Sequence, residues 1–265
     1  MPIRSKSLLK LALFGVICLW SGSTVARTMQ SPLHIMIDPG HGGSDKGAVR
    51  GSLVESEIAL QVANYLADIL RADPRFKVSM TRTGDQRISL RQRTELARKV
   101  GADLFISIHL NSSPDPRAHG TEIYFQNQLP ADEEALFLVS RESADEETND
   151  THSSKSSEPI SVQTDLKRIL EDLRRNERIR SSGELSKVLY ETLTRKGQGP
   201  KLGSRAIRQA PFHVVSEIDI PSVLVELGFL SHPQEGPRLK QPDYQRELAR
   251  LLAEGLVKYK ESLTN

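Results

Sequence analysis

Cysteine is almost absent from this 265-residue chain, and its single cysteine, Cys18, lies in a short apolar run near the N-terminus. A chain with one thiol cannot form an internal disulfide and offers no cysteine cluster for zinc. Any metal would therefore be held by histidines and carboxylates. The two residues before Cys18, Val16 and Ile17, are also larger than a lipoprotein cleavage site would require.

Long hydrophobic runs are also lacking. The apolar run Leu11–Trp20 has about half of the roughly 20 residues that a membrane-spanning helix needs. It follows three basic residues and precedes a stretch of small residues that ends at Ala26. This layout is typical of a secretory signal peptide, so we expect residues 1–26 to be removed and residues 27–265 to be exported; a retained membrane anchor is the alternative.

A block of basic residues is missing as well. The chain has a formal charge of +2, and the expected signal peptide carries three basic and no acidic residues, so the exported part has a charge of −1. Nothing in this pattern supports binding to nucleic acids. Export without disulfides indicates the periplasm or the cell wall, and the absence of an appended wall-binding repeat favours the periplasm.

From Leu33 onward, short apolar segments alternate with stretches at helical spacing. The alternation predicts an α/β fold: one domain with a mixed sheet of about six strands flanked by helices on both faces. The expected strands are 33–38, 76–80, 103–109, 121–125, 212–215 and 222–226, and the expected helices are 53–70, 90–100, 185–193 and 244–259.

Residues 129–180 form a different kind of sequence within this domain. Between Ala131 and Glu158 there are nine acidic and two basic residues, and residues 149–158 are rich in serine and contain no aliphatic side chain. This composition favours a mobile acidic insertion. Further along, four aliphatic residues share one helical face: Leu166, Ile169, Leu170 and Leu173.

Three polar residues stand where strands end or a helix begins. His41 lies in the Gly-rich turn after the first expected strand, His109 ends the third, and Glu55 opens the first helix. The C-terminal ends of strands in such sheets form the ligand-binding edge. Two histidines and one carboxylate with an open fourth position are a known catalytic zinc set. Each residue alone also has a structural explanation, so the prediction depends on their convergence.

Glu226 ends the apolar strand 222–226 in the same manner. A carboxylate after a buried strand is costly unless it is paired or functional. Amide hydrolysis at a metal centre needs a base that takes the proton of water and passes it to the leaving amine. Glu226 is our candidate for that base, and a salt-bridged structural glutamate is the alternative.

Five segments of the chain share the pattern of one known family: Ile37–Gly43 (IDPGHGG), Glu55 with Leu60, Arg82–Asp85 (RTGD), Ser107–Asn111 (SIHLN) and Pro221–Ser231 (PSVLVELGFLS). Together they resemble the zinc-dependent N-acetylmuramoyl-L-alanine amidases of cell-wall separation and remodelling, over about residues 34–260. The resemblance implies hydrolysis of the amide bond between N-acetylmuramic acid and L-alanine in peptidoglycan. It further implies that zinc is bound by His41, Glu55 and His109, and that Glu226 is the catalytic carboxylate. Glu57 is a rival to Glu55, but the family places its ligand at the first acidic residue of this helix.

The resemblance also gives the insertion a meaning. Members that act in cell division carry a helix there, which covers the zinc until a LytM-type activator protein binds. Residues 140–144 (SRESA) resemble that helix, which would place Glu142 at the fourth zinc position; Glu133, Glu134 and Glu146 are less favoured candidates. The charged run 145–147 departs from the family pattern, and a solvated acidic loop is the alternative.

Two other functions fit parts of the sequence. A zinc carboxypeptidase or aminopeptidase would use the same kind of site and would bind a terminal charge, with Arg93 or Arg205 as candidates for a carboxylate. A catalytically silent peptidoglycan-binding protein would be favoured if a ligand or Glu226 were replaced. None of the four is replaced, so the amidase remains the preferred prediction.

Overall fold

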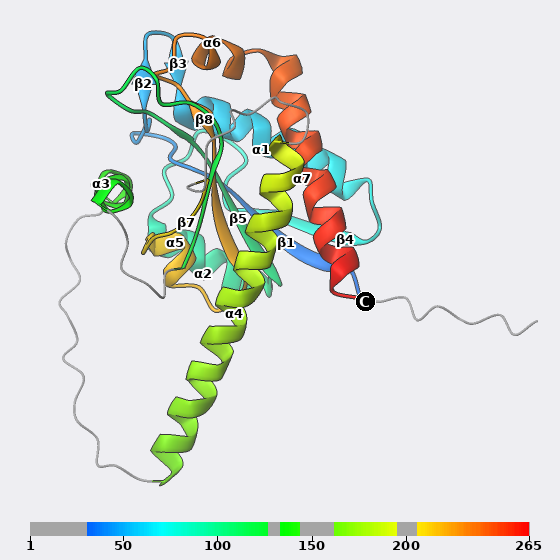
Figure 1. Ribbon diagram of the computed structural model, residues 1–265. Coiled ribbons are helices and arrows are strands. Elements are labelled where there is room, and N and C mark those ends of the chain that lie inside the picture. The colour runs from blue at the N-terminus through cyan, green and yellow to red at the C-terminus, as the bar shows by residue number, and fades with distance from the viewer. Residues whose placement is uncertain (1–30, 127–132, 144–161, 195–205, 265) are drawn as a thin grey trace, which may run out of the picture. The chain divides into compact units, whose positions relative to one another are not determined.

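The computed structural model of the protein describes residues 31–126, 133–143, 162–194 and 206–264, and from Pro32 onward these belong to one compact unit. The main strands are β1 (Leu33–Pro39), β4 (Phe76–Met80), β5 (Leu104–Asn111), β6 (Glu122–Phe125), β7 (Ile207–Gln209) and β8 (Ser222–Phe229). They form one six-stranded sheet in the order β4-β1-β5-β8-β6-β7 (Figure 1). Only the β6–β8 pair is antiparallel, which confirms the predicted mixed sheet.

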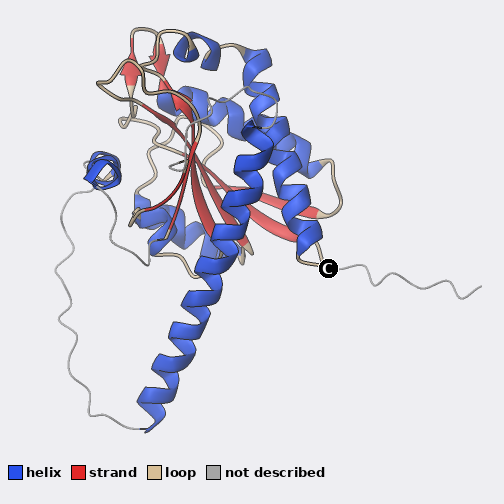
Figure 2. Ribbon diagram, viewed as in Figure 1, coloured by secondary structure: helices blue, strands red, loops and turns tan. Residues whose placement is uncertain are grey.

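Helices cover both faces of this sheet (Figure 2). One face carries α1 (Glu55–Arg71), α4 (Val162–Thr194) and α7 (Pro242–Ser262), which share an apolar core with the central strands. The other face carries α2 (Leu90–Val100), α3 (Glu133–Glu142) and α5 (His213–Ser216), which contribute to a second core. The short helix α6 (Glu235–Leu239) and the hairpin of β2 (Val49–Arg50) and β3 (Leu53–Val54) complete the described elements. The predicted α/β architecture is confirmed.

The central strands are buried between the two helical layers. Ile35 and Ile37 of β1 belong to the core beneath α1, whereas Met36 between them belongs to the other core. Successive side chains of a strand point to opposite faces, and a parallel strand covered on both faces is apolar throughout. Polar residues therefore collect beyond the strand ends, where the chain leaves the sheet.

One predicted strand is wrong. Residues 213–215 lie in α5, with Phe212 as its N-cap, and the sixth strand is the three-residue β7. Four residues, three of them apolar, contain no periodicity that separates a strand from one helical turn. The first helix also begins at Glu55 instead of residue 53, because Leu53 and Val54 pair with Arg50 and Val49.

The acidic insertion contains two helices, so the expectation of a mobile loop fails for its described part. Helix α4 is continuous over 33 residues, and its C-terminal half packs Leu185, Leu189 and Leu193 into the core. Its N-terminal half extends beyond the sheet (Figure 1). The predicted apolar face of that half is 45–59% exposed at Leu166, Ile169, Leu170 and Leu173. Residues 144–161, which include Glu146, lie outside the described residues.

The predicted signal peptide, residues 1–26, also lies outside the described residues. Within the described part of the chain, no helix combines the length and the apolar character that crossing a membrane requires.

Candidate metal centre

The ends of three neighbouring strands define the site. Strands β1, β5 and β8 run parallel, so their C-terminal ends meet at one edge of the sheet. His41 follows β1, and His109 on β5 is in register with Glu226 on β8. Glu55 opens α1 at the same edge, as its contacts with both histidines show. The structure thus brings together the residues that the sequence singled out.

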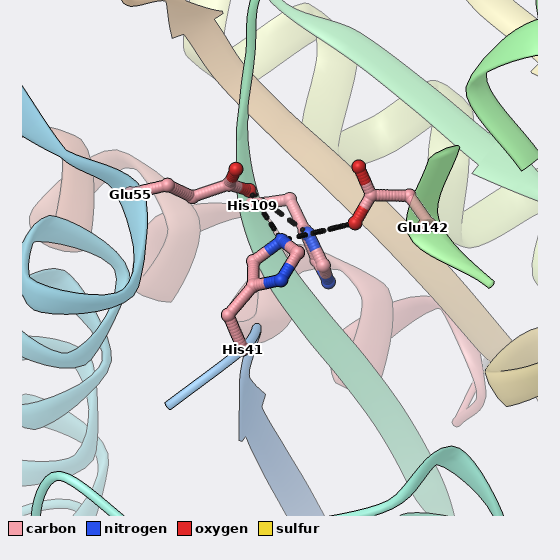
Figure 3. Close-up of side chains that lie close together, drawn as sticks. All are labelled: His41, Glu55, His109 and Glu142. Carbon is pink, nitrogen blue, oxygen red and sulfur yellow. Dashed lines mark hydrogen bonds and ion pairs between the residues drawn. The ribbon is translucent and has the colours of Figure 1, made fainter. Parts of the chain in front are cut away.

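Four side chains converge at this edge (Figure 3): His41, Glu55, His109 and Glu142. Their candidate ligand atoms all lie within 4.8 Å of one another. Glu55 Oε1 is 3.1 Å from both His41 Nε2 and His109 Nδ1. Glu142 Oε2 is 3.0 Å from His41 Nε2 and 3.3 Å from His109 Nδ1. Two imidazoles and two carboxylates at this spacing can hold one divalent cation.

Two of these atoms are the strongest evidence for a metal site. His41 Nε2 and Glu142 Oε2 are buried, and neither has a partner with hydrogen-bond geometry among the described residues, although they are 3.0 Å apart. A short contact without that geometry arises when both atoms face a shared point. Buried polar atoms without partners are rare in folded proteins. A cation at the shared point would satisfy both atoms, so the donor set fits a metal ion.

Electrostatics favour positive charge at the same point. Burial acts to lower the pKa of His41, but the charge of Glu55, the hydrogen bond to Asp45 and the close Glu142 carboxylate raise it well above its ordinary value. Burial acts in the same direction on His109, and the close Glu142 carboxylate and the hydrogen bond to Glu55 raise its pKa to about 9. Against its own burial, Glu55 has its pKa lowered to about 2, mainly by His41. The carboxylates thus create a negative potential that a bound cation would neutralise.

Glu55, and not Glu57, faces the histidines. Glu55 is fully buried, and its two oxygens accept hydrogen bonds from the backbone N–H groups of Ala48 at 2.8 Å and Leu110 at 3.0 Å. These two hydrogen bonds hold the carboxylate in the orientation that faces the cluster. Glu57 also belongs to the first turn of α1, but it is exposed and lies outside the cluster.

Asp45 orients His41 from the other side of the ring. His41 Nδ1 lies 2.8 Å from Asp45 Oδ2, which leaves Nε2 directed at the cluster. A carboxylate behind a ligating histidine fixes the ring and its tautomer. Our sequence analysis did not single out Asp45; the available signal was a carboxylate four residues after a histidine within one Gly-rich turn.

Two glycines allow the ligands to approach one another. A Cβ atom at Gly40 would lie 2.5 Å from the His109 ring. A Cβ atom at Gly47 would lie 2.5 Å from His41 Cδ2 and 2.6 Å from Glu55 Oε2, and Gly47 has a positive φ of 63°. Any other residue at these positions would have to displace a candidate ligand.

Two buried arginines hold the turn that carries His41. Arg93 donates to Asp38 Oδ1 at 2.6 Å and to the His41 carbonyl at 2.8 Å, and Arg82 donates to the Gly40 carbonyl at 2.7 Å. His41 itself has a φ of 56°, which is an unfavourable conformation for a residue with a side chain. The two guanidinium groups stabilise this conformation by binding the carbonyl groups of the turn. Arg93 is 3% exposed and fully engaged there, so it is not available to bind a substrate carboxylate.

We expect the Asp38→Asn substitution to lower the free energy of unfolding at neutral pH by about 3–5 kcal/mol, because it leaves the Arg93 charge buried without a counter-charge. Burial acts to raise the pKa of Asp38, but Arg93, Thr81 and Ser107 lower it below its ordinary value. A lowered pKa contributes stability above the unfolded value of about 3.9 and loses it as the pH falls through the folded value. The difference between variant and wild type should therefore shrink below about pH 4.

Urea denaturation in the presence of a chelator, over a pH series, measures this difference. The matched control is Asp68→Asn, because Asp68 is 76% exposed and lies 3.7 Å from Arg71. The control should change the free energy of unfolding by about 0.5 kcal/mol or less. Equal effects of the two substitutions would contradict a stabilising role for Asp38.

Glu226 lies beside the cluster without belonging to it. Its side chain is fully buried, and neither carboxylate oxygen has a hydrogen-bond partner among the described residues. Burial raises its pKa well above the ordinary value; the negative charges of Glu55 and Glu142 act in the same direction, and His109 and Arg141 oppose it. A buried carboxyl group without partners costs stability. Glu226 lies next to the candidate metal site, which is where hydrolysis at a metal would require a group that transfers protons.

Helix α3 delivers the fourth carboxylate. Arg141 donates to Glu142 Oε1 at 2.9 Å and to the carbonyl of Ser112 at 2.8 Å, so it joins the end of α3 to the loop after β5. The Glu142 side chain is 6% exposed. Burial acts to raise its pKa, but the close His109 and His41 rings lower it well below the ordinary value. Glu133, by contrast, is exposed at the start of α3. Our sequence analysis did not anticipate the contact made by Arg141.

Comparison with known proteins places this site in a family. Residues 35–258 match the family described as N-acetylmuramoyl-L-alanine amidase. The chain is 33% identical over 240 residues to the probable N-acetylmuramoyl-L-alanine amidase AmiB of Haemophilus influenzae, covering 89% of this chain and 54% of that protein. It is 34% identical over 227 residues to the N-acetylmuramoyl-L-alanine amidase AmiA of Salmonella typhimurium, covering 85% and 75%. The chain thus spans about half of the first relative and three quarters of the second.

A solved structure of an N-acetylmuramoyl-L-alanine amidase has the same fold. The N-acetylmuramoyl-L-alanine amidase of Clostridium difficile 630 superposes with a TM-score of 0.65 at 26% identity, covering 88% of this chain and 98% of that one. The family match includes every strand of the main sheet except the first two residues of β1, and it includes His41, Glu55, His109, Glu142 and Glu226. The protein belongs to the N-acetylmuramoyl-L-alanine amidase family.

Proposed function

We propose that this protein hydrolyses the amide bond between N-acetylmuramic acid and L-alanine in peptidoglycan, for cell-wall remodelling or daughter-cell separation. The observation that carries the proposal is the unpaired, buried Glu226 carboxyl group beside the cluster of His41, Glu55 and His109. A metal-dependent amidase needs at least a metal site and a neighbouring group that transfers protons.

We further propose zinc as the metal, with His41, Glu55 and His109 as its ligands. Two imidazole nitrogens and a carboxylate oxygen are a donor set that zinc hydrolases use, and the site contains no thiolate. When bound, zinc would supply the Lewis acidity that polarises the substrate carbonyl and acidifies water. Asp45 would hold the His41 ring in the ligating orientation.

In this proposal Glu226 moves the proton. Its carboxylate accepts a proton from the attacking water and donates it to the nitrogen of the leaving L-alanine as the amide bond breaks. A carboxyl group with a raised pKa holds that proton near neutral pH better than an exposed glutamate would. The absence of other hydrogen-bond partners leaves both oxygens available for the transfer.

The described arrangement fits a resting state. Glu142 lies between the two histidines, at the position that water or a substrate carbonyl would have to enter. Arg141 keeps this carboxylate in place through its contacts with Glu142 and Ser112. We propose that Glu142 is an autoinhibitory ligand and that α3 must move before substrate binds.

A LytM-type activator protein is the proposed partner. Leu136 and Phe137 on α3 are 47% and 65% exposed, and α4 exposes its own aliphatic face from Leu166 to Leu173. These exposed apolar side chains on α3, which carries Glu142, and on α4 offer a surface that a partner could bind in order to move α3. We also propose that residues 1–26 are a signal peptide that directs the protein to the periplasm or cell wall.

The products test the reaction. Digested sacculi should yield peptides whose new N-terminal residue is L-alanine, together with glycan strands that keep their lactyl groups, as mass spectrometry can show. Release of single amino acids would instead indicate a peptidase. Binding of sacculi without any new amino group, even after removal of the Glu142 side chain, would indicate a silent binding protein.

A further inference from the structure

Helix α3 brings two charged side chains of opposite sign into the site. Glu142 Oε2 faces His41 and His109 at 3.0 and 3.3 Å, where the metal is proposed to bind (Figure 3). The other oxygen, Oε1, accepts hydrogen bonds from Arg141 Nη2 at 2.9 Å and Nε at 3.2 Å. The remaining nitrogen of Arg141, Nη1, donates to the carbonyl oxygen of Ser112 at 2.8 Å. A carboxylate at the histidines and a cation at a backbone carbonyl thus lie side by side.

The Ser112 carbonyl group is held in one direction by its neighbours. The N–H group of the same peptide plane, that of Ser113, donates to Ser231 Oγ at 3.0 Å. The C=O and N–H groups of a planar trans peptide point in opposite directions, so this bond directs the Ser112 carbonyl away from Ser231 and towards Arg141. The N–H group of Ser112 donates to Asn111 Oδ1 at 2.7 Å. The loop after β5 therefore fixes this acceptor through hydrogen bonds that do not involve α3.

Arg141 also lies close to the proposed proton-transfer group. Burial acts to lower the pKa of Arg141, but the charges of Glu142 and Glu226 raise it above its ordinary value. Burial raises the pKa of Glu226, and Arg141 is one of the charges that oppose this shift. The strand register agrees, because Ser112 comes three residues after His109, which is in register with Glu226. The cation on the Ser112 carbonyl is thus within electrostatic reach of Glu226.

The products of the proposed reaction carry the same two charges. Hydrolysis breaks the bond between the lactyl carbonyl carbon and the nitrogen of L-alanine. The water oxygen ends on that carbon as part of a carboxylate, and both water protons end on the nitrogen, which becomes an ammonium group. The carboxylate forms on the side of the histidines, where Glu142 lies, and the ammonium group forms on the side of the group that protonates it, Glu226. Glu142 and Arg141 therefore match the two products in charge and in order.

We propose, on the basis of the function proposed above, that the Ser112 carbonyl binds the nitrogen of the scissile amide and of the leaving amine, and that Arg141 occupies this position in the resting state. When α3 moves, the carbonyl loses its donor, and a carbonyl without a partner costs free energy. The N–H group of the substrate takes the place of Arg141. Its hydrogen bond to Ser112 orients the nitrogen towards Glu226 and stabilises the positive charge that the nitrogen gains.

Calorimetry on the metal-loaded protein tests this assignment with two peptides. L-alanyl-D-glutamate has an ammonium group at its N-terminus, and propionyl-D-glutamate has a hydrogen atom in its place. The Arg141→Ala variant should bind the ammonium peptide about tenfold or more tightly than the propionyl peptide, because a charged hydrogen bond is gained. The wild type, whose site is filled by Arg141, should differ by no more than about twofold between the peptides. Any loosening of α3 acts on both peptides and cancels in this comparison.

Arg98→Ala is the matched control. Arg98 also donates to a backbone carbonyl, that of Glu217 at 3.4 Å, but it is exposed on α2 and lies outside the cluster. Its replacement should leave the preference between the two peptides as in the wild type. An Arg141→Ala protein without a preference for the ammonium peptide would overturn the proposal.

A second measurement addresses the carbonyl itself. Replacing Ser113 by its α-hydroxy acid turns the amide that contains the Ser112 carbonyl into an ester, whose carbonyl is a weaker acceptor. In the Arg141→Ala protein this ester should reduce the preference for the ammonium peptide by about threefold or more beyond the effect of Ser231→Ala. Ser231→Ala removes the same hydrogen bond from Ser113 but keeps the amide carbonyl. Equal effects of the two changes would remove the Ser112 carbonyl from the site.

Binding and cleavage together separate this proposal from the proposed reaction. If Arg141→Ala prefers the ammonium peptide but sacculi are not cleaved by the wild type or by Glu142→Gln, the amidase reaction fails and the amine site stands. If sacculi are cleaved and Arg141→Ala shows no preference, the reaction stands and the amine site is wrong.

Discussion

Replacing Glu226 with glutamine is expected to lower the release of peptides from sacculi by about 100- to 10,000-fold, the range that a general acid–base group contributes. Glutamine has nearly the same shape but cannot take up and return the proton. Because Glu226 lies outside the group of candidate ligands, the metal content of the variant should equal that of the wild type. Release is measured by chromatography of soluble peptides, and metal content by mass spectrometry of the same preparation.

The matched control for this variant is Glu57→Gln. Glu57 is an exposed glutamate on α1, close to the site in sequence but outside the cluster. Its replacement should leave both release and metal content within about twofold of the wild type. A Glu226→Gln protein that keeps its metal and remains as active as this control would remove Glu226 from the mechanism.

Replacing Glu142 with glutamine is expected to raise peptide release in the absence of any activator by about tenfold or more. The Glu142 carboxylate lies 3.0 Å from His41 and 3.3 Å from His109 and is the proposed fourth ligand. A neutral amide binds a cation more weakly than a carboxylate, so the substitution shifts the equilibrium away from the closed arrangement. The reaction itself does not use Glu142, so its removal frees the position beside the histidines without removing a catalytic group.

Glu133→Gln serves as the control for this second substitution. Both residues lie on α3, but Glu133 is exposed at its first position and is not part of the cluster. Its replacement should not change release. An unchanged basal rate in Glu142→Gln, in a protein that binds metal and cleaves sacculi, would mean that Glu142 does not restrain the enzyme.

The sequence predicted the parts of the fold that depend on long apolar patterns. Strands β1, β5 and β8 are short, mostly apolar segments, and α1 and α7 repeat apolar residues at helical spacing, so length and spacing together predicted their types. The segment 212–215 was too short for periodicity to separate helix from strand. The sequence predicted a helix at 185–193 and a helical face from Leu166 to Leu173, but not that both belong to the single helix α4, because its N-terminal half is exposed and polar around most of its circumference.

The sequence predicted some residues of the site from topology, others only through the family resemblance, and some not at all. His41 follows β1, and His109 and Glu226 lie in the C-terminal halves of β5 and β8, so topology alone predicts that they meet at one edge. Glu142 was proposed only through the resemblance to known amidases, since nothing in its local sequence fixes where α3 packs. Arg141 and Asp45 could not be assigned, because their roles depend on loop geometry and on contacts such as that between Arg141 and Ser112, 29 residues apart.

The most direct test of the account measures metal content and amide cleavage in the same sample, before and after chelation and after zinc is returned. The chain without the proposed signal peptide, residues 27–265, carries the Glu142→Gln substitution for this purpose, so that the resting state does not limit the rate. The account predicts about one zinc ion per chain, loss of cleavage with loss of the metal, and recovery of new N-terminal L-alanine when zinc is restored. Cleavage that persists in the metal-free protein, or a new N-terminus other than L-alanine, would contradict it.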